Sequence, residues 1–131
     1  MSTTILALDI GERKIGIARA NNIAKIAEPL TTLINDETFP EKLEDIISKE
    51  NAGLIVVGLP RGLEGQDTQQ TKYVKDFMDG IDLAIPFRFQ DEALTSVKAE
   101  ERLSKNSKSY TKHDIDSNAA SIILEDYLLE N

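Results

Sequence analysis

The sequence has no cysteine and no tryptophan, and it has a single histidine. The lack of cysteine excludes a disulfide framework, a thiolate zinc site and a thiol nucleophile, and it is compatible with a reducing compartment. The histidine, His113, lies in a polar stretch, and we interpret it as a surface residue rather than as an acid or a base. Catalytic chemistry in this chain would therefore depend on other polar side chains.

Long apolar runs are missing as well. None approaches the roughly 20 residues that span a bilayer, and residues 1–8 lack the charged start and the cleavage site of a signal peptide. We therefore expect a cytoplasmic protein that does not bind membranes. Its 131 residues, 40% of them hydrophobic and 29% charged, are typical of one globular domain.

Basic residues are outnumbered, with 15 Lys and Arg against 23 Asp and Glu and a net charge of −8. This balance is unusual for a nucleic-acid-binding protein, because basic residues supply much of the affinity for phosphates. A cluster of acids that holds cations would account for part of the charge, and total charge says little about local patches. Residues 103–113 carry Lys105, Lys108 and Lys112 without an acid, which indicates either a solvated loop or a basic loop that contacts a substrate.

The first apolar segment, residues 5–10, alternates around an aspartate and predicts a buried strand with Ile5, Ala7 and Asp9 on one face. A turn and a second β-type segment follow, which predicts an antiparallel hairpin. The rest of the chain alternates between strand and helix patterns, and residues 54–59 are apolar throughout, as in a central parallel strand. The expected strands are 5–10, 15–20, 29–34, 54–59 and 85–89, and the expected helices are 36–50, 73–81, 97–103 and 115–127.

This order of elements predicts an α/β fold, with a mixed sheet of about five strands and helices on both faces. Neither an internal repeat nor a linker interrupts it. We interpret Gly58 as a position of close packing and Gly65 as a turn residue.

Asp9 is an ionisable residue inside an otherwise apolar strand. Burial of an unpaired carboxylate is unfavourable, so a buried Asp9 needs a partner, a metal ion or a water-filled cleft. The alternative is an edge position, where Asp9 would point to solvent or cap the turn before Gly11.

Further acids follow a later strand and open the last helix. Asp91 and Glu92 come directly after the expected strand 85–89, and because successive residues of an extended chain point in opposite directions, only one of the two should reach a common cleft. We favour Glu92 for its longer side chain and keep Asp91 as the alternative. Asp116 lies at the edge of the apolar stripe of the last helix, where it could equally be a helix cap.

Acids at these three places of an α/β fold can converge at one edge of the sheet. Crowded carboxylates repel one another and favour a hard cation with oxygen ligands, chiefly Mg²⁺ or Mn²⁺. One such ion can activate a water while a second stabilises the leaving oxygen in the attack on a phosphodiester. Such a site requires the carboxylates to lie within roughly 4 to 6 Å of one another.

Four segments of the chain resemble, in order, the signature segments of the YqgF (RuvX-like) family: ILALDIGERKIGIA at 5–18, IVVGLPRGLEGQ at 55–66, FQDEALTSVKAEERL at 89–103 and DIDSNAASIILEDYL at 114–128. They cover nearly the whole chain, and their order and spacing make the resemblance more specific than any single motif. The resemblance implies one RNase H-like nuclease domain over residues 1–131. It also implies a metal-dependent hydrolase, described for this family as the nuclease that matures the 5′ end of 16S ribosomal RNA and as a Holliday-junction resolvase.

The resemblance implies roles for individual residues. Asp9 matches the aspartate of the first strand, Asp91 and Glu92 match the start of the family's Asp-Glu-Arg triplet, and Asp116 matches the aspartate before the small residues of the last helix. These positions imply that Asp9, Glu92 and Asp116 are the catalytic residues and the ligands of Mg²⁺ or Mn²⁺. The implied partner is nucleic acid, structured RNA in preference to branched DNA, and the implied assembly is a monomer or a homodimer.

The sequence departs from the family pattern at three places. Ala93 replaces the arginine of the triplet, residues 110–113 replace a glycine-containing approach to the last aspartate, and Arg61 precedes Gly62 where an asparagine is common. Other cations could supply the missing positive charge, although each could equally be a solvent-exposed residue. The candidate substrate-binding residues are Arg13, Lys14, Arg61, Lys105, Lys108 and Lys112.

Two rival classes remain. The Asp-x-Gly turn at the end of the first strand also resembles the phosphate-binding turn of actin-like ATPases and sugar kinases, but those proteins need two related domains, and this chain shows no second such turn. A non-catalytic nucleic-acid or ribosome-assembly module is the other rival, motivated by the net charge and by Ala93. The presence of all three acids argues against it.

Overall fold

The computed structural model describes residues 3–92 and 112–131, and for residues 112–117 it describes the backbone alone. Eight elements follow one another in the described part. They are β1 (Thr4–Ile10), β2 (Lys14–Asn21), β3 (Ala27–Ile34), α1 (Phe39–Glu50), β4 (Ala52–Pro60), α2 (Gln69–Asp79), β5 (Phe87–Glu92) and α4 (Lys112–Glu130).

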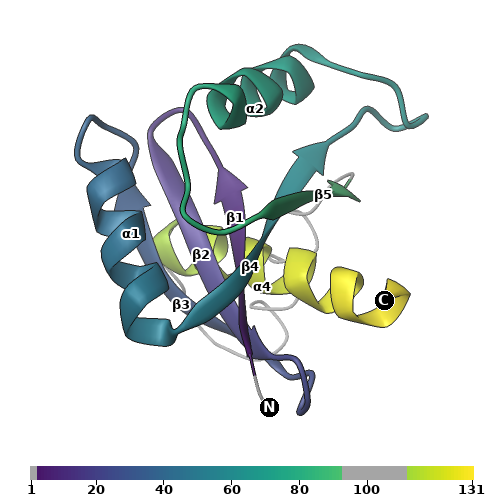
Figure 1. Cartoon of the computed structure of the whole chain (residues 1–131). Helices are drawn as coiled ribbons and strands as arrows, with labels where there is room; N and C mark the ends of the chain where they lie inside the picture. The colour runs from purple at the N-terminus through teal and green to yellow at the C-terminus, as the bar shows by residue number, and fades with distance from the viewer. Residues whose placement is uncertain (1–2, 93–111) are drawn as a thin grey trace.

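The five strands form one mixed sheet in the order β3-β2-β1-β4-β5. β1, β2 and β3 form an antiparallel meander, whereas β1, β4 and β5 are parallel. Helices α1 and α2 lie on one side of the sheet and α4 crosses the other (Figure 1). The structure therefore confirms the predicted α/β fold, with its mixed five-stranded sheet and helices on both faces.

The alternation of side chains along the strands divides the core into two clusters. On the face covered by α1 and α2, Leu6, Leu8 and Ile10 of β1 pack in one cluster with the buried residues of both helices. On the opposite face, Ile5 and Ala7 of β1 pack in a second cluster with buried residues of α4. We call the second side of the sheet the α4 face. The predicted division of β1 into two faces is confirmed.

Local sequence explains where the first two helices begin and end. α1 has a proline in its first turn, where the missing N–H has no intrahelical partner, and it ends at Asn51 in the left-handed conformation (φ 53°). α2 begins at a reciprocal capping box, in which the side chains of Thr68 and Thr71 each accept from the other's backbone N–H. The predicted start of α1 at residue 36 is three residues early, because Asp36 instead accepts hydrogen bonds from Thr38 ahead of the helix.

Helix α4 differs from the prediction in two ways. It begins at Lys112, so His113 lies in its first turn rather than in a loop, because no helix breaker separates His113 from the apolar part of the helix. Residues 119–124 are also all buried, which is wider than one stripe, since Ala119 and Ile122 form a cluster apart from the residues that face the sheet. None of the helices in the described ranges is long and apolar enough to cross a membrane.

The last strand also differs from the prediction. β5 spans Phe87–Glu92 instead of 85–89, because pairing with β4 starts at Phe87 and continues until Glu92 lies beside Pro60. Polar residues do not end the strand, because the backbone pairing with β4 continues through them while Gln90 and Glu92 are buried and Asp91 is exposed. The predicted helix over residues 97–103 lies outside the described residues.

Candidate active site

Asp9 occupies the end of a central strand. β1 is hydrogen-bonded to β2 on one side and to β4 on the other, so the alternative of an edge position is wrong. Asp9 is half-buried and pairs across the hairpin with Gly16. It follows Ile5 and Ala7 at the spacing of two residues that keeps side chains on one side of a strand, so it lies on the α4 face.

Asp91 and Glu92 have opposite environments, as the strand alternation predicts. Glu92 is 7% exposed, whereas the Asp91 side chain is 68% exposed. Gln90, two residues before Glu92, donates a hydrogen bond of 2.7 Å to Glu130 of α4, which identifies the α4 face as the face that Gln90 and Glu92 share. Glu92 is therefore the acid on the same face as Asp9, and Asp91 points to the other side.

A glycine of β4 lies in the row that joins the end of β1 to Gln90, two residues before the row in which Pro60 pairs with Glu92. Leu8 pairs with Val57 and Gln90 pairs with Gly58, so Gly58 occupies the β4 position between the ends of β1 and β5. A Cβ atom at Gly58 would lie 2.3 Å from Cδ1 of Ile123 in α4. The predicted close packing at Gly58 is confirmed, and it lets α4 approach the sheet next to the end of β1.

Arg61 explains the orientation of Asp91. Its guanidinium donates to Oδ1 of Asp91 through Nε at 3.3 Å and through Nη2 at 3.2 Å, and it also forms a short ion pair with Asp67. The Arg61 backbone N–H donates to the carbonyl oxygen of Glu92 at 3.0 Å. Arg61 thus connects the ends of β4 and β5 and holds Asp91 away from the α4 face. Its positive charge is shared between two aspartates, and its role in substrate binding stays a prediction.

The turn after Asp9 is held by contacts that the sequence did not reveal. The Asn35 side chain donates to the Gly11 carbonyl oxygen at 2.8 Å and to the Tyr73 hydroxyl at 2.9 Å. The Gln70 side chain donates to the Ile10 carbonyl oxygen at 3.2 Å. These bonds fasten the end of β1 to α2 and to the segment before α1. No local pattern predicts them, because the partners are 24 to 60 residues apart in the chain.

The remaining predicted site residues are either exposed or outside the part of the chain that the structure describes. Asp116 is the fifth residue of α4, and its side chain, like that of Lys112, is outside the described part. Arg13 and Lys14 are exposed in the β1–β2 hairpin. Lys105 and Lys108 lie outside the described residues, as does Ala93. Gly65, predicted as a turn residue, has a φ of 82° with open space around it, which confirms the turn.

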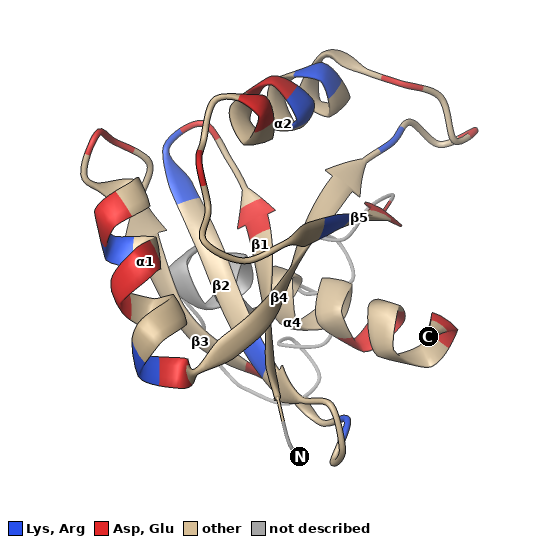
Figure 2. Cartoon of the chain, in the orientation of Figure 1, with Lys and Arg blue, Asp and Glu red and all other residues tan. Residues whose placement is uncertain are grey.

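The charge pattern at this end of the sheet is mixed. Figure 2 shows acidic residues at the tip of β1 and along the segment between β4 and α2, with basic residues scattered among them. Among the side chains that the structure describes, no three acids or histidines lie close enough to hold one metal ion. The described carboxylates, Asp9 and Glu92, supply the oxygen donors that suit a hard divalent cation. The predicted separation of the three acids stays a prediction, because it needs the side chain of Asp116.

The strand order and the helices on both faces define an RNase H-like fold, and solved structures share it. RuvC of Thermus thermophilus, solved with a Holliday-junction substrate, superposes with a TM-score of 0.51 at 11% identity over 98% of this chain and 94% of that chain. The fowlpox virus resolvase, solved with Holliday-junction DNA, also gives a TM-score of 0.51, at 13% identity over 98% of both chains. Identities this low show the fold alone.

Sequence comparison identifies the family. The family model described as "RuvX: Holliday junction resolvase" matches residues 3–130, so the chain belongs to the RuvX family. A relative from Sulfurihydrogenibium is 39% identical over 95% of this chain and 88% of its own length. Another, from Chloroflexus aurantiacus, is 42% identical over 95% of this chain and 85% of its own length. Both relatives are named as candidate pre-16S rRNA nucleases.

Proposed function

We propose that this protein is a divalent-metal-dependent nuclease that hydrolyses phosphodiester bonds during maturation of the 5′ end of pre-16S ribosomal RNA in the cytoplasm. The observation that carries the proposal is the placement of Asp9 and Glu92 on the α4 face at the carboxyl ends of parallel strands. Membership of the RuvX family and the names of the relatives support the substrate. Residues 1–131 would act as one nuclease domain.

Asp9, Glu92 and Asp116 would hold Mg²⁺ or Mn²⁺. When bound, these ions supply an activated water and stabilise the negative charge of the leaving oxygen. Asp9 is positioned by a strand that is paired on both sides, and Glu92 by the backbone bond from Arg61. Asp116 lies in the first part of α4, the helix that packs on the same side of the sheet. The close approach at Gly58 keeps this helix next to both strands.

A four-way DNA junction is the second candidate substrate, favoured by the description of the family model. The same carboxylates would serve both reactions, since each breaks a phosphodiester bond. The two differ in assembly, because resolution of a junction needs two symmetric cuts and therefore a dimer, whereas a monomer can trim an RNA end. We favour the RNA substrate because the relatives carry that name.

A cleavage assay tests the proposal on a structured RNA with the pre-16S 5′ leader and on a four-way DNA junction, each with Mg²⁺, Mn²⁺ or a chelator. We expect metal-dependent cleavage of the RNA, and a loss of about 100-fold or more in Asp9→Asn, whose neutral side chain still fits the strand. Asp45→Asn is the matched control, because Asp45 is exposed on α1. Cleavage by Asp9→Asn at the parental rate would refute the assigned site, and cleavage of neither substrate by the parent protein would favour a non-catalytic module.

A further inference from the structure

The edge strand β5 exposes two aromatic side chains just before the acids. Phe87 is 36% exposed and Phe89 is 39% exposed, and their rings pack edge to face with centroids 5.4 Å apart. Among the strands in residues 3–92, β5 pairs with β4 alone, at the end of the sheet. Phenylalanine is usually buried in the core, so two neighbouring exposed phenylalanines form an unusual apolar patch.

Between the two rings, Arg88 points to the opposite face. It is exposed, and it forms no ion pair with any residue in the described ranges. Strand alternation places Arg88 on the same face as Gln90 and Glu92. A cation that no acid of the described part neutralises is available to a phosphate, in contrast to Arg61.

The same strand runs directly from these residues to the candidate active site. At about 3.3 Å per residue, Phe89 lies roughly 10 Å and Phe87 roughly 17 Å along the strand from Glu92. Asp91 is the acid on the side of the two rings, and its carboxylate is ion-paired with Arg61, which also binds Asp67.

We propose that Phe87, Arg88 and Phe89 form a binding site for unpaired nucleotides of a substrate strand that passes over the sheet edge at β5. The rings lie on the face covered by α1 and α2, whereas Arg88 lies on the α4 face with the candidate active site. The two rings stack on bases, and Arg88 binds a backbone phosphate. Aromatic rings combined with a basic groove are the usual means of binding single-stranded nucleic acid, since every base has a face on which a ring can stack. This inference rests on the proposed function and extends it, because it requires the nuclease to bind single-stranded segments of its substrate.

The test measures binding rather than cleavage. The anisotropy of a fluorescein-labelled single-stranded RNA and of a blunt RNA duplex is followed in Ca²⁺ buffer with the parent chain, with Phe87→Leu/Phe89→Leu and with Phe87→Tyr/Phe89→Tyr. The leucine variant keeps apolar side chains but loses the rings, so we expect its Kd for the single strand to rise about tenfold while the duplex is unaffected. The tyrosine variant keeps the rings and should bind like the parent chain.

Arg88→Gln provides an independent readout. The loss of one phosphate contact should reduce the slope of log Kd against log salt concentration by about 0.7 for a single strand. The matched control is Ile23→Ala/Ile26→Ala, which changes two exposed apolar residues, 67% and 72% exposed, in the loop between β2 and β3. Circular dichroism recorded during thermal unfolding confirms that each variant is folded.

Several results would overturn the inference. These are unchanged single-strand affinity in the leucine variant, equal losses for single strand and duplex, or conversion of a dimer into a monomer, which would identify β5 as an interface between copies of the chain. The proposed function and this nucleotide site can be refuted independently of each other. If the parent chain cuts no substrate but the leucine variant still loses single-strand binding, the nucleotide site stands without the nuclease.

Discussion

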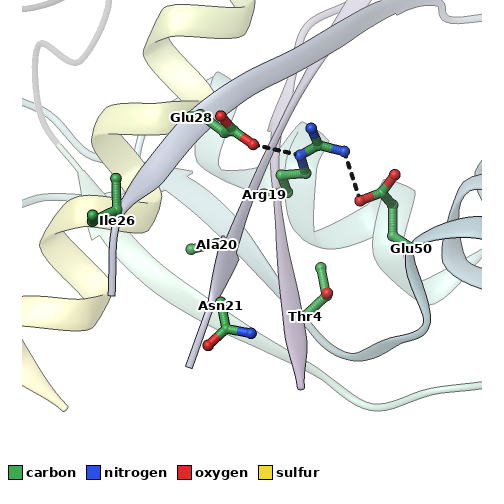
Figure 3. Close-up of a pocket in the computed structure, with 7 residues that line it drawn as sticks. All are labelled: Thr4, Arg19, Ala20, Asn21, Ile26, Glu28 and Glu50. Atoms are coloured by element: carbon green, nitrogen blue, oxygen red, sulfur yellow. Dashed lines mark hydrogen bonds and ion pairs between the residues drawn. The ribbon is translucent and has the colours of Figure 1, made fainter. Parts of the chain in front are cut away.

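The two ends of the sheet each hold an arginine between two acids, yet the two clusters have different consequences. At the end where β1 begins, Arg19 binds Glu28 at 2.7 Å and Glu50 at 2.8 Å. These residues line a cavity of about 280 Å³ (Figure 3). At the end where β4 and β5 finish, Arg61 binds Asp67 and Asp91.

The Arg19 cluster joins β2, β3 and α1 through two ion pairs. It does not choose between two neighbouring acids, since it binds both of its glutamates. The hydrogen bonds that Arg19 donates to Glu28 and Glu50 raise the pKa of Arg19, which is charged at every ordinary pH in any case. The Arg61 cluster binds one of two adjacent acids and leaves the other on the α4 face. The same chemistry therefore joins neighbouring elements at one end of the sheet and, at the other, binds the acid that points away from the α4 face. The difference arises because only the second arginine lies where two parallel strands end.

The largest expected effect separates the two neighbouring acids. Glu92→Gln should reduce cleavage about 100-fold or more, because it removes a charged oxygen donor from the candidate site. Asp91→Asn should change the rate by less than about threefold, because Asp91 faces the other side of the strand. Single-turnover cleavage of the pre-16S leader measures both. Reversal of the two effects would assign Asp91 to the site and show that the Arg61 contact does not persist with substrate bound.

Two glycines allow the packing at the ends of the sheet to be compared. Gly58→Ala should destabilise the fold by about 1 to 3 kcal/mol, because the added carbon overlaps the buried Ile123 side chain. Gly53→Ala meets only the Cγ2 atom of Thr3, near the start of the chain, which can move, so its effect should stay within about 0.5 kcal/mol. Urea unfolding measures the difference. Equal effects would mean that α4 does not pack tightly at Gly58.

The smallest expected effects concern the two arginines. Arg19→Gln and Arg61→Gln should each lower stability by about 1 kcal/mol or less, since exposed ion pairs contribute little. Only Arg61→Gln should also slow cleavage, by a few fold, because it frees Asp91 and loosens the end of β5. The double variant Arg61→Gln/Asp91→Asn should recover most of that loss. An equal loss of cleavage in Arg19→Gln would remove the distinction between the two clusters.

Most of the fold was predictable because its signals are local. The alternation around Asp9, the apolar run of β4 and the helical spacing in α1 depend on neighbours within a few residues. The errors lie at element boundaries. The end of β5 was missed because pairing with β4, rather than the polarity of residues 90–92, decides where the strand stops.

The sequence by itself determined the order of strands and helices, the face of β1 on which Asp9 lies, and the rule that Asp91 and Glu92 point in opposite directions. The order follows from the change between strand and helix periods along the chain, and the other two properties follow from the period of two in an extended chain. Only the tertiary structure decided which of the two acids shares the α4 face, that Arg61 binds the other, and that Phe87 and Phe89 are exposed on the last strand of the described sheet. These outcomes depend on Arg61, α4 and the strand order, which folding brings together from distant parts of the chain.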